Sequence, residues 1–115
     1  MYSHEEVYKN SLEYFNGDEL AASVFVNKYA LQDKDGNYLE ISPDDMHKRM
    51  ARELGRIESK YPNSISENEI YEMFKDFKYI VPQGSPMSGI GNETKIQSLS
   101  NCFVVPAPYD SYAGI

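Results

Sequence analysis

The segment that most constrains this 115-residue chain is residues 83–92, QGSPMSGIGN, which holds three glycines and one proline. Residues that break helices and strands stand too close together here for regular structure, so we predict an irregular surface loop. A glycine-rich loop can also bring backbone N–H groups close to a ligand. The known phosphate-binding motifs do not match, because Ile90 stands where a P-loop requires lysine.

A short apolar segment follows this loop and is predicted to be a buried strand over Ile96–Val105. Its continuous apolar end, Phe103–Val105, is typical of a parallel sheet that is covered on both faces. Ser98, Ser100 and Cys102 alternate along the strand and therefore share one face. Because a core strand rarely carries so many small polar groups on one side, we expect that face to look toward a cavity or a ligand.

Cys102 is the only cysteine, so the chain cannot form an internal disulfide. One interpretation is a buried thiol that packs as a small apolar group, and the spacing alone favours it. The other is a redox thiol that pairs with a cysteine on another segment. His4 and His47 lack nearby cysteine or histidine partners, so we predict surface residues and no metal site.

The region before the loop is predicted to be a helical bundle over residues 1–78. Capping residues and apolar spacing predict four helices, over residues 3–16, 18–31, 42–61 and 66–78. Their predicted apolar stripes are Tyr8, Leu12 and Phe15; Leu20, Val24 and Tyr29, with Ala21, Phe25 and Tyr29 beside them; Met46, Met50, Leu54 and Ile57; and Ile70, Met73, Phe74 and Phe77.

Charged residues give few functional signals. Four basic side chains on the third predicted helix, Lys48, Arg49, Arg52 and Arg56, are interpreted as a solvated face rather than an anion site. Residues 32–37 are predicted to form a polar turn, because their acidic residues do not have the spacing of a calcium loop.

Net charge and hydropathy limit the classes of partner. A net charge of −7 would repel a phosphate backbone, which argues against nucleic-acid binding. No window approaches the ~20 apolar residues of a membrane span, and the first residues lack the pattern of a signal peptide. We therefore expect a cytoplasmic protein without a membrane partner.

Several sequence runs resemble the N-terminal part of the catalytic (large) subunit of ribonucleotide reductase. They are PQGSPMSGIGN, followed by SLSNCFVV and DSYAGI, with GDELAASVFVNKYAL and SPDDMHKRMARELGRIE upstream. The resemblance extends from about Asp18 onward and is greatest to the adenosylcobalamin-dependent branch of the family.

The resemblance implies a mainly α fold, in which the N-terminal helical bundle leads into an incomplete α/β barrel. Residues 79–115 would supply the substrate loop and the first of ten barrel strands. Ser85 would contact the substrate phosphate or ribose, and Asn101 would contact the substrate largely through its backbone. Cys102 would be one of two thiols that reduce the ribose 2′ position and leave as a disulfide.

The resemblance also implies partners. The radical cysteine, the second redox cysteine and the shuttle cysteines would lie on the remainder of the catalytic subunit, and a thioredoxin-type protein would supply electrons. The radical source would be adenosylcobalamin or, as the alternative, a radical-generating small subunit, and neither is expected to bind this chain alone. One thiol cannot deliver two electrons, so we expect the isolated chain to be inactive. A split subunit, an intein-interrupted gene and a truncation all fit this expectation.

A different class of function stays open on the residues alone. The chain could be an acidic helical interaction module, whose strand adds to the edge of a partner's sheet and whose cysteine is idle.

Overall fold

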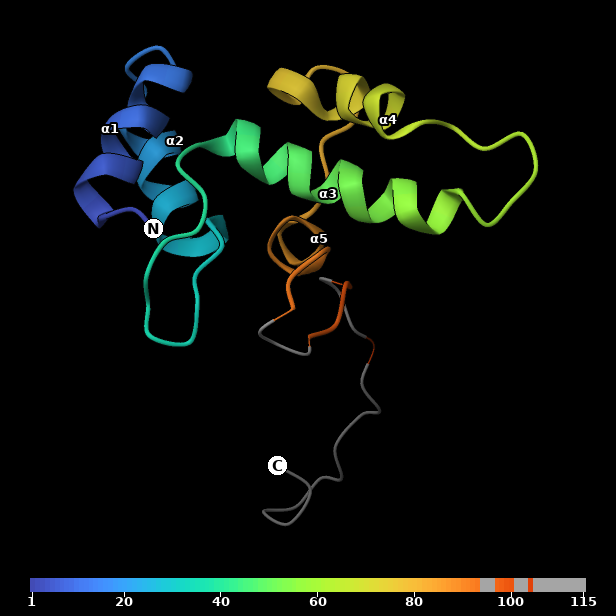
Figure 1. The fold of residues 1–115 in the computed structure, drawn as a ribbon. Helices are drawn as coiled ribbons and strands as arrows, with labels where there is room; N and C mark the ends of the chain where they lie inside the picture. The colour runs from blue at the N-terminus through green and yellow to red at the C-terminus, as the bar shows by residue number, and fades with distance from the viewer. Residues whose placement is uncertain (94–96, 101–103, 105–115) are drawn as a thin grey trace, which may run out of the picture.

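The computed structural model describes residues 1–93, 97–100 and 104, and the regular elements within them are helical (Figure 1). No strand occurs in this described part, where Tyr38 forms only isolated bridges with Tyr2 and Gln32. None of the described helices is long and apolar enough to cross a membrane. The helices are α1 (His4–Tyr14), α2 (Glu19–Val24), the π-helix η1 (Phe25–Tyr29), α3 (Pro43–Glu58), α4 (Glu67–Phe74), the 3₁₀-helix η2 (Lys75–Phe77) and α5 (Gly84–Gly89).

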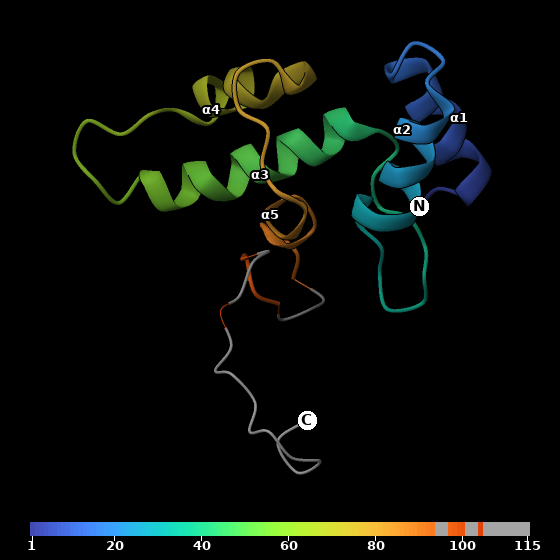
Figure 2. The same ribbon diagram turned by 180° about the vertical axis from the view of Figure 1, so that it is seen from behind.

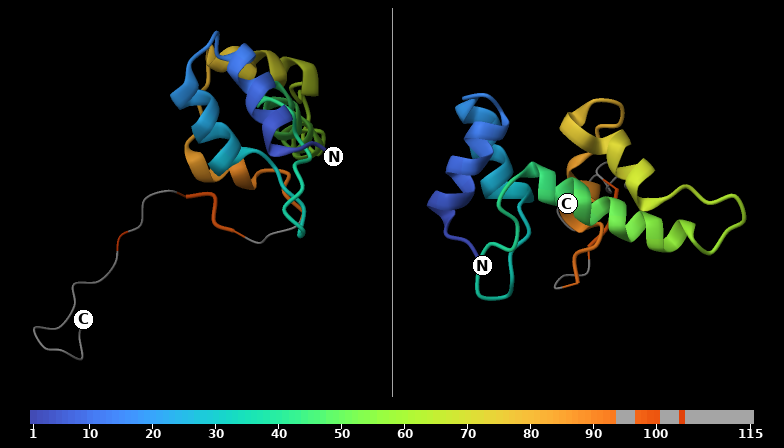
Figure 3. Two further views of the ribbon diagram at one scale, coloured as in Figure 1. Left: turned by 90° about the vertical axis from the view of Figure 1, so that its left-hand side faces the viewer. Right: turned by 45° about the horizontal axis from the view of Figure 1, so that its top comes forward.

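The helices are arranged around α3, which is the longest of them (Figures 1 and 2). The α1 and α2 helices lie side by side at the N-terminal end of α3 (Figure 3). The α4 helix packs along one side of α3, and α5 lies on the other side, next to η1. The predicted mainly α fold is therefore confirmed for the described residues, whereas the barrel stays a prediction.

The capping residues predicted the starts of the first four helices correctly. Ser3, Asp18 and Ser66 each accept a hydrogen bond from the backbone N–H three residues further on, as N-caps do. Ser42 makes no such bond, and α3 begins instead with Pro43, whose fixed φ suits the first turn of a helix.

The second predicted helix is observed, and of its two predicted apolar rows the one that contains Phe25 reaches the core. After α2 the backbone widens into η1, where the N–H of Ala30 bonds to the carbonyl of Phe25 five residues back. Phe25 and Val26 are buried, whereas Leu20 is 75% exposed. The prediction of Leu20 as a core residue was therefore wrong, while that of Phe25 in the neighbouring row is confirmed.

The core forms where α1, η1, α3 and α4 meet. Met46 and Met50 of α3 are buried at its centre, which confirms that these methionines fill the core. The buried apolar residues are Val7, Ala22, Phe25, Val26, Ala30, Tyr38, Met46, Met50, Ala51, Ile70 and Phe74.

His47 is also buried, and its prediction as a surface residue was wrong. Its ring stacks on Phe74 at 6.3 Å between centroids and meets the ring of Phe77 edge-on at 4.6 Å. The segment α4–η2 covers this face of α3, which periodicity along α3 could not show. Neither ring nitrogen has a hydrogen-bond partner in the described part of the chain. Burial lowers the pKa of His47 below its ordinary value. The negative charges of Asp44 and Asp76 act in the other direction and raise the pKa, but burial has the larger effect.

We expect acid to destabilise the fold through His47. The unfolded chain takes up a proton at the ordinary pKa of 6.5, but the folded state resists it. The free energy of unfolding should therefore be unaffected above that pH and fall by up to about 1.4 kcal/mol per pH unit below it, until the lowered pKa is reached. Urea unfolding of the wild-type chain and of His47→Phe, between pH 5.5 and 7.5, measures this difference.

The exposed His4 provides the control for this experiment. His4→Gln should retain the pH dependence of the wild-type chain, and His47→Phe should lose most of it. An unchanged slope in His47→Phe would show that other groups cause the pH dependence.

Candidate functional site

Ser85 lies in the first turn of α5, inside the segment that we predicted to be irregular. That prediction was wrong for residues 84–89, which form a six-residue helix. The hydroxyl of Ser88 donates to the carbonyls of Gly84 at 3.2 Å and Ser85 at 3.4 Å, and these bonds within α5 stabilise the short helix. Ser85 is half-buried.

Two glycines let this segment pack closely against its neighbours. A Cβ on Gly84 would lie 2.9 Å from the hydroxyl of Tyr29 in η1. A Cβ on Gly91 would lie 2.9 Å from Cγ of Arg49, and Gly91 also has a φ of +76°, which glycine adopts without strain. Here the glycines serve close packing of α5 and the following turn rather than an open loop.

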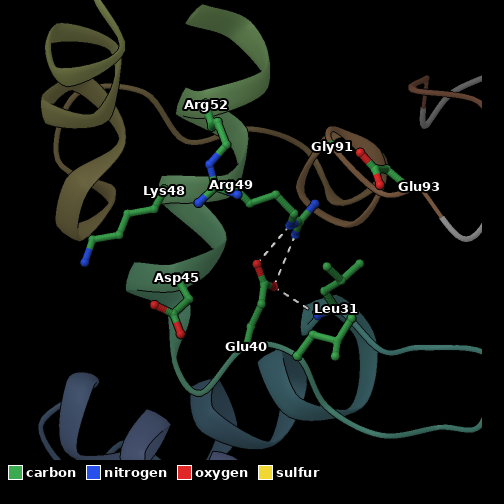
Figure 4. Close-up of a pocket in the computed structure, with 9 residues that line it drawn as sticks. Leu31, Glu40, Asp45, Lys48, Arg49, Arg52, Gly91 and Glu93 are labelled. Atoms are coloured by element: carbon green, nitrogen blue, oxygen red, sulfur yellow. Dashed lines mark hydrogen bonds and ion pairs between the residues drawn. The ribbon is translucent and has the colours of Figure 1, made fainter. Parts of the chain in front are cut away.

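Arg49 connects α3 to the C-terminal end of α5. Its Nη1 donates to the carbonyl of Ile90 at 2.5 Å, and its Nη2 donates to that of Met87 at 2.6 Å. Its Nε donates to Oε2 of Glu40 at 2.9 Å, which completes an ion pair (Figure 4). Oε1 of Glu40 accepts from the N–H of Leu31, just after η1, at 3.0 Å.

The interpretation of Arg49 as part of a solvated face was therefore wrong. The side chains of Arg49 and Glu40 are only 6% and 5% exposed, so water screens their interaction little. The interpretation does hold for Lys48, Arg52 and Arg56, which are exposed on the same helix. Lys48 and Arg56 form exposed ion pairs within α3, and such pairs add little stability.

Gln97 covers α5 from a later part of the chain. Its Nε2 donates to the carbonyl of Ser85 at 3.3 Å and to the hydroxyl of Ser88 at 3.0 Å. The described residues 97–100 and 104 form no strand, and the rest of the predicted strand, with Asn101 and Cys102, lies outside the described residues. The structure therefore places Ser85 but does not test the other two predicted site residues.

An open cavity of about 460 Å³ lies beside the Arg49–Glu40 pair (Figure 4). Charges of both signs line it, so it has no clear preference for an anion or a cation. Within the described residues, no group of three or more His, Cys, Asp or Glu side chains could hold a metal ion. The lining residues are Leu31, Leu39, Glu40, Asp45, Lys48, Arg49, Arg52, Gly91 and Glu93.

The described fold is a small helical domain, in which a buried ion pair holds a short serine-bearing helix. Residues 15–91, which are most of the chain, match the family described as the ribonucleotide reductase, all-alpha domain. The chain therefore belongs to this family. The match confirms the predicted resemblance at the level of the family and includes Ser85, Arg49 and Glu40. No curated protein and no solved structure matches the chain.

Proposed function

We propose that this chain is the N-terminal part of a ribonucleotide reductase catalytic subunit and acts in the reduction of ribonucleotides to deoxyribonucleotides. Membership of the all-alpha domain family is the observation that carries the proposal. The remainder of the catalytic subunit would be its partner and would supply the other catalytic residues. By resemblance, the radical source would be adenosylcobalamin or a radical-generating small subunit, and a thioredoxin-type protein would restore the thiols.

Ser85 would contribute a contact to the phosphate or ribose of the substrate. The position of Ser85 supports this role, because it lies in the first turn of a helix that is held in place at both ends by contacts with other segments. A polar group on such a fixed support can bind a ligand without a large loss of conformational entropy. Asn101 would add a backbone contact.

Cys102 would be one of the two thiols that reduce the substrate. Reduction of the 2′ carbon requires two electrons, and two thiols supply them when they form a disulfide. The chain has one cysteine, so the second thiol would come from the remainder of the subunit. On this proposal the chain binds and reduces substrate only in the assembled enzyme.

We expect Ser85→Ala to raise the KM for the ribonucleotide about tenfold in the assembled enzyme, because one hydrogen bond to a charged or polar substrate group is lost. The kcat should change less, since the hydroxyl takes no part in the reduction itself. Steady-state kinetics of the chain combined with the remainder of the catalytic subunit measures both constants.

The matched control is Ser64→Ala in the exposed connection between α3 and α4, which should keep wild-type constants. An unchanged KM in Ser85→Ala would remove the assigned substrate contact. If the wild-type chain binds that remainder but no deoxyribonucleotide forms, the non-catalytic interaction module becomes the better account of this protein.

A further inference from the structure

We infer that the buried Arg49–Glu40 pair is a positioning device, which sets the place of Ser85 in the substrate site. The inference rests on the proposed function. It adds two residues that do not touch the substrate but determine where the substrate contact stands.

The short helix α5 depends on other segments for its stability. A helix of six residues is too short to be stable by itself, and its last carbonyls lack partners within the helix. The guanidinium of Arg49 donates to two of these carbonyls, at Met87 and Ile90. A cation at this end also interacts favourably with the helix dipole. Arg49 therefore supplies the hydrogen-bond donors that the carbonyls at the end of this short helix lack.

Contacts at both ends of α5 fix its position. Arg49 holds the C-terminal end of the helix against α3, while Gly84 places its N-terminal end against Tyr29 of η1. Ser85 lies between these two fixed points. A shift at either end would move its backbone and its hydroxyl, and a displacement of about 1 Å can cost up to about a hundredfold in an enzyme site.

Glu40 connects Arg49 of α3 to the backbone next to η1. One carboxylate oxygen accepts from Nε of Arg49, and the other accepts from the N–H of Leu31, next to η1. The pair thus couples the position of α3 to that of η1, the two elements that α5 contacts. Because both side chains are buried, this arrangement has few alternatives with equal energy.

Lysine cannot reproduce this arrangement. An ammonium keeps the charge, but its three donors sit on one nitrogen and cannot span two carbonyls and a carboxylate as the planar guanidinium does. Arg49→Lys should therefore preserve the fold and loosen α5. In the 115-residue chain, amide exchange should become at least about tenfold faster at Met87 and Ile90, whose N–H groups bond within α5, and stay unchanged in the buried turns of α3.

In the assembled reductase, Arg49→Lys should raise the KM for the ribonucleotide about tenfold, with a smaller change in kcat. Glu40→Gln should act in the same direction, since the neutral amide pairs less strongly with the guanidinium. Arg56→Lys is the matched control, because it alters an exposed ion pair on the same helix and should leave exchange and KM unchanged.

A double-mutant cycle separates this inference from the proposed function. Arg49→Lys combined with Ser85→Ala should raise the KM by less than the product of the single effects, because both act through one contact. If Ser85→Ala raises the KM but Arg49→Lys changes neither exchange nor KM, the positioning role is wrong and the substrate contact stands. If Arg49→Lys lowers only the stability and the KM keeps its wild-type value, the pair is purely structural and the inference is overturned.

Discussion

Cys102→Ser is expected to abolish multiple turnover of the assembled reductase, by roughly three orders of magnitude or more. In the proposed reaction the substrate would gain two electrons, and each thiol of a pair would supply one when the disulfide forms. Serine has nearly the same shape but cannot form that bond. The chain has no second cysteine to substitute for it. The measurement is deoxyribonucleotide formed per active site over many turnovers, with the variant chain assembled with the remainder of the subunit.

Loss of activity could also follow from failed assembly with the remainder of the subunit, so the amount of complex is measured by size-exclusion chromatography. Ser64→Cys should stay active, and Ser64→Cys combined with Cys102→Ser should stay inactive, because a thiol in the exposed α3–α4 connection is in the wrong place. Wild-type turnover by Cys102→Ser would remove the assigned redox role and favour the interpretation of Cys102 as an apolar packing residue.

Arg49→Met should have the largest effect on stability among the substitutions considered. Methionine has a similar length but leaves the carboxylate of Glu40 buried without its cation. Loss of one partner of a buried ion pair typically costs about 3–5 kcal/mol, which is a large share of the stability of a domain this small. The carbonyls of Met87 in α5 and of Ile90, which follows it, also lose their donor. Urea unfolding monitored by circular dichroism gives the change in the free energy of unfolding.

A second substitution distinguishes an unpaired charge from lost packing. Arg49→Met combined with Glu40→Leu removes both charges, and we expect it to recover a substantial part of the lost stability. The exposed pair gives the control, since Arg56→Met should change the stability little. If Arg49→Met proves as stable as the wild-type chain, water must reach the site, and the ion pair would not be a buried structural element.

The described helices could be predicted largely from local signals. Ser3, Asp18 and Ser66 accept hydrogen bonds from backbone N–H groups only three residues away. Their role as N-caps can therefore be predicted from the neighbouring sequence. Pro43 starts α3 for a similarly local reason.

The site was less predictable, because its contacts join distant segments. Arg49 was expected in water with its basic neighbours, but its partners are a carboxylate nine residues back and two carbonyls about forty residues ahead. His47 was expected on the surface, but α4 and η2 fold over it. Residues 84–89 were expected to be irregular, and they form a helix whose ends other segments hold.

The amino-acid sequence alone therefore determined where the first four helices begin, that the fold is mainly helical, and which family the chain resembles. Only the tertiary structure decided which charges are buried and how Ser85 is held. The physical reason is that capping and periodicity act within about one helical turn, whereas burial depends on which distant segment covers a residue. An arginine that the sequence places on an exposed helix face becomes a buried, structural residue only when another segment supplies a carboxylate and unpaired carbonyls as its partners.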